Sequence, residues 1–157
     1  MSERDKLQEA VAGKLKEFLL THKLRQTRER YAILRAAYEI EGTFTIEDLK
    51  EIMDAHRFNV STATLYSVAQ LLVQANLLMR HPFSFSSAVF ERIVDSRPRS
   101  YQVCNSCHRI TKIKSKELAA AVETYHPRSF AVSHRVTYVY GTCLKCARKK
   151  VRVRALG

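Results

Sequence analysis

The sequence predicts an α+β protein of two small domains, one mostly helical and the other a mixed domain built around a metal site. Three observations lead to this prediction. Apolar residues recur at helical spacing over much of the first 75 residues, short β-rich segments dominate the remainder, and all four cysteines lie in the second half. With 157 residues, of which 46% are hydrophobic, the chain is long enough for one domain or two small ones.

The cysteines form two Cys-x-x-Cys pairs, Cys104/Cys107 and Cys143/Cys146. Two thiolates three positions apart can bind one ion from a single turn, and a second pair closes a tetrahedral site of four sulfurs. This spacing predicts one structural Zn2+ per subunit. Disulfides would need an oxidising compartment, but the N-terminus is charged and has no apolar secretory core, so we expect a cytoplasmic protein.

Charge is distributed unevenly along the chain, whose formal net charge is +12. Residues 1–90 carry 12 basic and 11 acidic side chains, whereas residues 91–157 carry 15 basic and 4 acidic side chains. The basic excess favours a polyanionic partner, most often nucleic acid, although a surface that only confers solubility can have the same composition. No apolar run approaches the ~20 residues of a membrane span, so we expect no membrane partner.

The first 75 residues predict four helices. Apolar residues recur at helical spacing over 5–20 and 31–38. Thr45 and Asp48 predict a capping box at the start of a third helix, and Ser61 is a suitable N-cap for a fourth helix that runs to about residue 75.

The fourth predicted helix has an apolar side and a polar side. Its apolar residues share one face, at positions i, i+3, i+4 and i+7: Leu65, Val68, Ala69 and Leu72. The outward face is left with Thr62, Ala63, Tyr66, Ser67 and Gln70. Two helices joined by a short turn, the second with such a face, are typical of a helix-turn-helix, which reads the major groove of DNA. On pattern alone, an ordinary helical hairpin is an equal alternative.

Two strands, over 77–79 and 89–93, are predicted directly after this helix. A hairpin in that place is a wing, so residues 1–94 are predicted to form a winged helix-turn-helix domain. Residues 95–100 lack apolar periodicity and are predicted to be a linker.

Residues 101–157 should form the second domain. We expect a helix capped by Ser115 and strands over 101–103, 110–113, 130–132 and 136–140. A domain shorter than ~70–80 residues rarely builds a sufficient core, so its fold should depend on the metal.

The order of these parts resembles the ferric uptake regulator family of bacterial metal-responsive regulators, over residues 20–146. The matching segments are Leu24-Arg25-x-Thr27-x-x-Arg30-x-x-Ile33-Leu34, Glu47-Asp48-Leu49, Ala63-Thr64-Leu65-Tyr66, Val89-Phe90-Glu91, Cys104-x-x-Cys107 and Tyr138-Val139-Tyr140-Gly141-x-Cys143-x-x-Cys146. The resemblance implies a winged-helix DNA-binding domain, a hinge and a small α/β dimerisation domain with a structural zinc. It also implies a homodimer that binds double-stranded promoter DNA and usually represses transcription, and no enzymatic activity.

The resemblance also implies roles for individual residues. Tyr66 would contact bases from the major groove, Arg25 would approach the minor groove, and Arg30 would contact a phosphate. The predicted DNA-binding set is completed by residues on the same helix as Tyr66: Thr62, Thr64 and Ser67. The family usually has Arg directly after this Tyr, so Ser67 removes one charged contact per subunit.

The sequence departs from the family most strongly at the regulatory metal site. The His-rich run that normally precedes the first Cys pair is replaced by Pro98-Arg99-Ser100-Tyr101. Four other ligand positions of the family are occupied by Thr43, Lys112, Ala119 and Arg135. Guanidinium and ammonium groups offer no lone pair to Fe2+ or Mn2+, so we expect the usual regulatory site to be absent. The remaining candidates for a second ligand site are Glu91, His134 and His108.

Several alternatives stay open at this point. The chain could be a signal-independent DNA-binding factor, or a thiol/zinc redox switch on the same scaffold. Haem is a weaker alternative, because Cys104-Asn105-Ser106-Cys107-His108 matches a c-type attachment pattern while the second Cys pair favours zinc. The basic tail, residues 148–154, could be a charged edge strand or an arm that binds phosphates.

Overall fold

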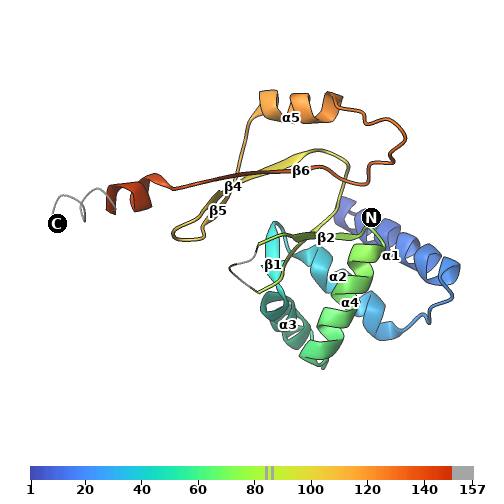
Figure 1. The fold of residues 1–157 in the computed structure, drawn as a ribbon. Coiled ribbons are helices and arrows are strands. Elements are labelled where there is room, and N and C mark those ends of the chain that lie inside the picture. The colour runs from blue at the N-terminus through green and yellow to red at the C-terminus, as the bar shows by residue number, and fades with distance from the viewer. Residues whose placement is uncertain (84, 86, 150–157) are drawn as a thin grey trace. The chain divides into compact units, whose positions relative to one another are not determined.

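The computed structural model describes residues 1–83, 85 and 87–149. The chain divides into two compact units, Met1–Val94 and Asp95–Gly157, each with its own three-stranded sheet (Figure 1). Two predictions fall partly outside the described residues: the loop of the wing at residues 84 and 86, and the basic tail beyond Lys149.

Four helices make up most of the first unit: α1 (Glu3–Thr21), α2 (Arg28–Glu39), α3 (Ile46–Ala55) and α4 (Thr62–Gln74). Each begins at a hydroxyl side chain that accepts a hydrogen bond from the backbone N–H three residues later, namely Ser2, Thr27, Thr45 and Ser61. The predicted capping box is confirmed, since the Asp48 carboxylate accepts in return from the Thr45 N–H. The first helix begins earlier than predicted because Ser2 and Asp5 form a second capping box.

A small antiparallel sheet completes this unit, with the strand order β1-β3-β2. β2 (Leu78–His81) and β3 (Val89–Arg92) form the predicted hairpin after α4. β1 (Thr43–Thr45) was not predicted, because three residues between two helices are too short to show an alternating pattern. Its place is decided by pairing with β3, where Phe44 lies opposite Phe90.

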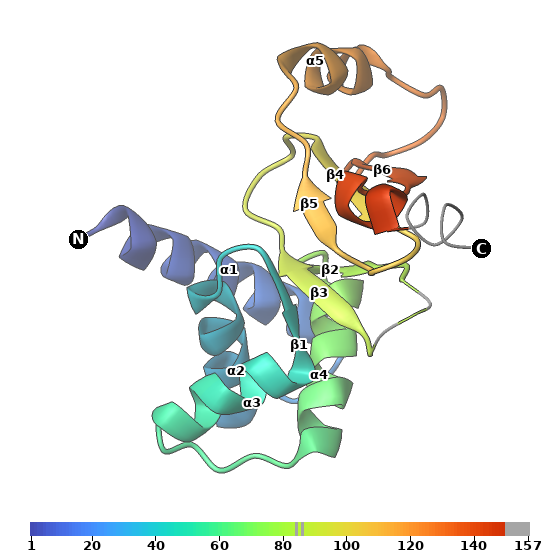
Figure 2. The same cartoon turned by 90° about the vertical axis from the view of Figure 1, so that its left-hand side faces the viewer.

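The core of the first unit fixes how α4 is presented. All four residues predicted for its buried side are buried, which leaves its polar face outward. At the base of the wing, the buried Tyr38 hydroxyl lies 2.7 Å from the Leu77 carbonyl oxygen and 2.8 Å from that of Ile93. Tyr38 thereby ties α2 to both ends of the hairpin, and Figure 2 shows α2, α3 and α4 gathered beside this sheet.

The second unit contains β4 (Arg99–Cys104), β5 (Ile110–Lys112), α5 (Lys116–Thr124) and β6 (Val136–Gly141). β4 is the central strand, antiparallel to β5 and parallel to β6. The parallel pair requires a long connection, which α5 and the following loop supply. The predicted cap at Ser115 is confirmed by its hydrogen bond from the Leu118 N–H.

Two predictions for this unit were wrong. The linker is shorter than 95–100, because Arg99 and Ser100 already pair with Val136 and Thr137 as part of β4. The predicted strand over 130–132 does not form, since the place beside β4 is taken by β6 and the segment has no neighbouring strand. Phe130 is instead 69% exposed.

The core of the second unit is small. Within its described residues, the buried side chains are Ser100, Tyr101, Val103 and Cys104, and no residue of α5 is buried. The aromatic rings of Tyr101 and Tyr138 stack with centroids 6.1 Å apart. None of the helices described is both long and apolar enough to span a membrane.

Candidate functional site

The four cysteines meet at one end of the second sheet. β4 and β6 run parallel with Cys104 opposite Gly141, so the two strands end together and deliver their Cys-x-x-Cys turns to the same place. The four Sγ atoms lie within 4.8 Å of one another, and those of Cys107 and Cys143 are 3.8 Å apart. All four are free cysteines, of which Cys104 is buried and Cys107 exposed. The predicted cluster of four sulfur ligands is thus formed by the fold.

Backbone N–H groups favour the thiolate form of Cys104 and Cys143. The amides of Cys107 and Cys143 lie 3.5 and 3.3 Å from the Cys104 Sγ, and their hydrogen bonds lower the pKa of Cys104 to about 5. The Cys146 amide likewise lowers the pKa of Cys143. The hydrogen bond between the Cys146 and Cys143 side chains raises the pKa of Cys146 to about 12. Four sulfurs at this spacing fit Zn2+.

The first Cys-x-x-Cys turn ends in a strained residue. His108 has a φ of 62°, in the left-handed region that favours glycine, and its N–H donates to the Cys104 carbonyl oxygen at 2.9 Å. This hydrogen bond closes the turn around the metal site.

We therefore expect His108→Gly to stabilise the zinc-loaded second unit by about 1 kcal/mol, because glycine adopts this conformation without the steric cost. Thermal unfolding followed by circular dichroism would measure the gain. Asn105→Gly is the matched control in the same turn, where φ is not positive, and it should give no gain. Equal or lower stability of the His108→Gly protein would contradict this explanation.

The candidates for a second ligand site are divided between the two units. Glu91 lies on β3 of the first unit, where its Oε2 accepts a hydrogen bond from His81 Nε2 at 2.9 Å. His108 and His134 belong to the second unit, in the Cys turn and in the loop before β6. Within the described ranges, the four cysteines are the only group of three or more His, Cys, Asp or Glu side chains that could hold an ion.

The pairing of His81 with Glu91 was not anticipated from the sequence. The available signal was weak: both are polar residues on otherwise buried strands of one hairpin. The hairpin register places His81 opposite Val89, two residues from Glu91, so the two side chains are diagonal neighbours on one face of the sheet.

The outward face of α4 is polar and carries no charge. Thr62 and Ser67 are exposed, while Thr64 and Tyr66 are half-buried and Tyr66 packs partly against the core. The Thr64 and Ser61 hydroxyl oxygens are 2.9 Å apart. No residue from Thr62 to Gln74 is charged. Any cations that accompany this face must therefore come from other elements.

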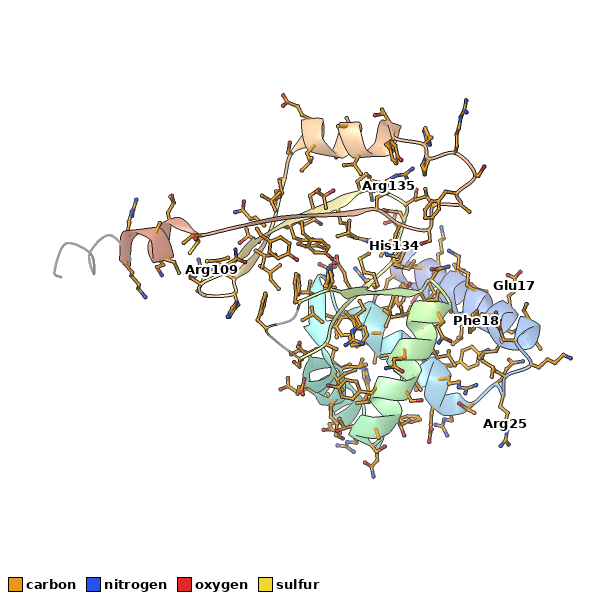
Figure 3. All side chains as sticks on the ribbon, viewed as in Figure 1. Glu17, Phe18, Arg25, Arg109, His134 and Arg135 are labelled. Atoms are coloured by element: carbon orange, nitrogen blue, oxygen red, sulfur yellow. The ribbon has the colours of Figure 1, made fainter. Side chains whose placement is uncertain are left out.

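Two of the predicted DNA-binding residues lie together before and within α2. Arg25 is exposed in the loop after α1, and Figure 3 shows its side chain extending from that loop. Arg30 lies in the first turn of α2, and its guanidinium Nη1 donates to the Arg25 carbonyl oxygen. Arg30 therefore supports the loop that carries Arg25, in addition to any contact of its own.

Comparisons with known proteins agree with this architecture. The peroxide operon regulator of Bacillus subtilis (strain 168) is 26% identical over 149 residues, covering 89% of this chain and 98% of that protein. The structure of the Helicobacter pylori ferric uptake regulator Fur aligns with a TM-score of 0.65 at 17% identity, covering 89% of this chain and 93% of that one. A zinc uptake regulator complexed with zinc and DNA aligns with a TM-score of 0.50 at 15% identity, covering 96% and 99% of the two chains.

The sequence profile of the ferric uptake regulator family matches residues 21–140. This match includes α2, α3, α4, the first sheet, all but the last residue of the second sheet and the first cysteine pair. The identities to the solved structures are low enough that they support the fold alone, but the profile covers most of the chain. The protein therefore belongs to the ferric uptake regulator family.

Proposed function

We propose that this protein is a cytoplasmic transcription regulator that binds promoter DNA as a homodimer, with one structural zinc per subunit, and that it represses transcription by occupying the promoter. Family membership supports the class of protein. The observation that carries the proposal is the polar face of α4, held outward by four buried apolar residues. A major groove admits a helix presented in this way.

The residues of α4 suit sequence recognition more than charge neutralisation. The Tyr66 ring can pack on a thymine methyl group while its hydroxyl bonds a base edge, and Thr62 and Ser67 add short hydroxyl donors. Arg25, next to the Arg30-supported loop, adds a cation. Selectivity would therefore come from α4 and part of the affinity from outside it.

A selection from random-sequence duplexes with the zinc-loaded protein tests this proposal. We expect one enriched sequence with two related half-sites, since a homodimer presents α4 twice. Tyr66→Ala should weaken binding to that duplex by about 10- to 100-fold and leave binding to a scrambled duplex nearly unchanged. Gln74→Ala, an exposed change at the other end of α4, is the matched control. No enrichment, or equal loss on both duplexes, would contradict the proposed role of α4.

The homodimer is supported by apolar surface on the second unit. Five large hydrophobic side chains there are more than half exposed: Tyr125, Phe130, Val139, Tyr140 and Leu144. A monomer rarely leaves so many exposed in one small unit. Light scattering of the zinc-loaded protein would give its mass in solution, and a monomer at micromolar concentration would contradict this part of the proposal.

We further propose that DNA binding does not require a regulatory Fe2+ or Mn2+. The proposal is supported by the sequence, which has Arg99, Lys112 and Arg135 where the family resemblance places metal ligands. Affinity for the selected duplex should change less than about twofold when Fe2+, Mn2+ or haem is added to the zinc-loaded protein at fixed salt. A tenfold gain, about 1.4 kcal/mol of coupling, would identify a ligand and refute the proposal.

A further inference from the structure

The metal centre gathers basic side chains from two distant parts of the sequence. Arg109 follows the first cysteine pair, Lys145 lies within the second pair, and Arg148 and Lys149 come directly after it. We name these four residues the knuckle cations. All four are exposed, and the 4.8 Å clustering of the sulfurs holds their backbones around one centre. Figure 3 shows Arg109 at the end of the β4–β5 hairpin, on the side of the short helix over residues 144–149.

Little negative charge in this unit opposes the knuckle cations. The sequence has no Asp or Glu between Asp95 and Glu117, and none after Glu123. In the described part of the unit, Arg97 forms an ion pair with Asp95, and none of the knuckle cations takes part in one. A zinc ion with four thiolates is a negative centre, so part of their charge is balanced there. The remaining cations of the unit leave a strongly basic surface.

The first unit can offer Arg25 and Arg30 to phosphates, but it has little net positive charge. Residues 1–90 are nearly neutral, with 12 basic and 11 acidic side chains, and α4 carries no charge. DNA affinity depends strongly on Lys and Arg that displace counterions from phosphates. A DNA-binding protein with a neutral recognition helix therefore needs a source of phosphate contacts elsewhere, and the basic excess of this chain lies in the second unit.

A surface pocket beside the cysteines offers donors for a phosphate. It has a volume of about 170 Å³ and lies against Cys104 and Cys143. Its polar lining is Arg109, Gln102, Thr111 and Thr142, and the rest includes Val103, Val139 and Tyr140. One guanidinium, one amide and two hydroxyls can all donate to phosphate oxygens. The pocket thus combines charge with neutral donors next to the metal centre.

We propose that the knuckle cations form a second DNA-contacting surface, which binds the phosphates of duplex DNA without regard to sequence. This inference rests on the proposed function. In it, α4 selects the DNA sequence, and the zinc end of the second unit supplies the charge-dependent part of the affinity. Duplex DNA is the favoured polyanion because the winged-helix unit would bind the same molecule and hold it near the second unit.

The test measures the salt dependence of binding to a mixed-sequence duplex of about 40 base pairs. The knuckle variant changes Arg109, Lys145, Arg148 and Lys149 to Gln. Each lost phosphate contact should reduce the slope of log K against log salt by about 0.9, so we expect a reduction of about 3.6 for the four side chains of one subunit. The control variant changes four exposed cations elsewhere in the same unit to Gln: Lys112, Lys114, Lys116 and Arg128. It should change the slope by less than about 1.

The outcomes separate this inference from the proposed function. Equal slopes for the two variants would mean that the salt dependence of DNA binding follows net charge alone. That result would overturn the proposal that the knuckle cations contact DNA. If the knuckle variant loses zinc, the charge-reversed Lys145→Glu/Lys149→Glu protein, with zinc content confirmed, gives the deciding slope. Tighter binding to duplex RNA or to anionic vesicles than to DNA would also overturn it. If the wild-type protein bound no duplex at all, the proposed function itself would fail.

Discussion

Replacing Cys104 with Ser is expected to unfold the second unit while the first unit stays folded. Cys104 is the buried member of the cluster and accepts hydrogen bonds from two backbone amides, so its loss removes a ligand and the anchor of both turns. Among its described residues the unit has few buried side chains to compensate, and none of them belongs to α5. Structural zinc contributes ~10–16 kcal/mol of binding free energy in small peptides, which exceeds what such a core can supply.

Two measurements on the full chain check this expectation. Bound zinc per subunit should fall from one to near zero in Cys104→Ser, and thermal unfolding should show one transition, from the first unit alone. Removing zinc from the wild-type protein with a strong chelator should have the same effect. Asn105→Ser, an exposed change within the same turn, should keep both zinc and stability. A second unit that remains folded without zinc would refute a structural role for the metal.

Helices and the metal site could be predicted from the sequence because their determinants are local. The hydroxyl residues Thr45 and Ser61 mark the starts of α3 and α4, and Cys-x-x-Cys spacing marks a two-ligand turn. The caps Ser2 and Thr27 were not used, so α1 and α2 begin two and three residues earlier than predicted. The apolar periodicity that shows which face of α4 is buried lies entirely within that helix, so it could be recognised without knowledge of distant segments.

Features that depend on pairing between distant segments could not be predicted. β1 is three residues long and exists because β3 passes beside it. The start of β4 at Arg99 depends on a parallel partner more than 30 residues later. The same limit applies to the candidate site, since Glu91 could be matched to a family motif but its contact with His81 depends on the hairpin register.

Replacing Glu91 with Ala is expected to destabilise the first unit by about 3 kcal/mol. The side chains of His81 and Glu91 are 0% and 6% exposed, and the 2.9 Å contact joins them beneath the wing. His81 also stacks on Phe83, with ring centroids 5.4 Å apart, so it cannot turn toward water without losing that packing. Removing the carboxylate leaves a buried imidazole without this acceptor. Removing one partner of a buried pair lowers the free energy of unfolding more than replacing both partners with apolar side chains.

A small set of variants distinguishes this pairing from a metal-ligand role for Glu91. Glu91→Gln keeps an acceptor oxygen and should cost less than Glu91→Ala, while Glu51→Ala, an exposed change on α3, should stay within about 0.5 kcal/mol. The double change His81→Leu/Glu91→Leu should also cost less than Glu91→Ala, because it leaves no polar group behind.

Chemical denaturation of each variant, with and without Mn2+, gives these differences in free energy of unfolding. If Glu91 served a regulatory ion, its replacement would matter mainly when Mn2+ is present. If Glu91 instead pairs with His81, its replacement lowers the free energy of unfolding by the same amount with and without Mn2+. The second outcome would mean that the Glu91 carboxylate stabilises the wing, and that a regulatory ion would have to break a buried pair to use it.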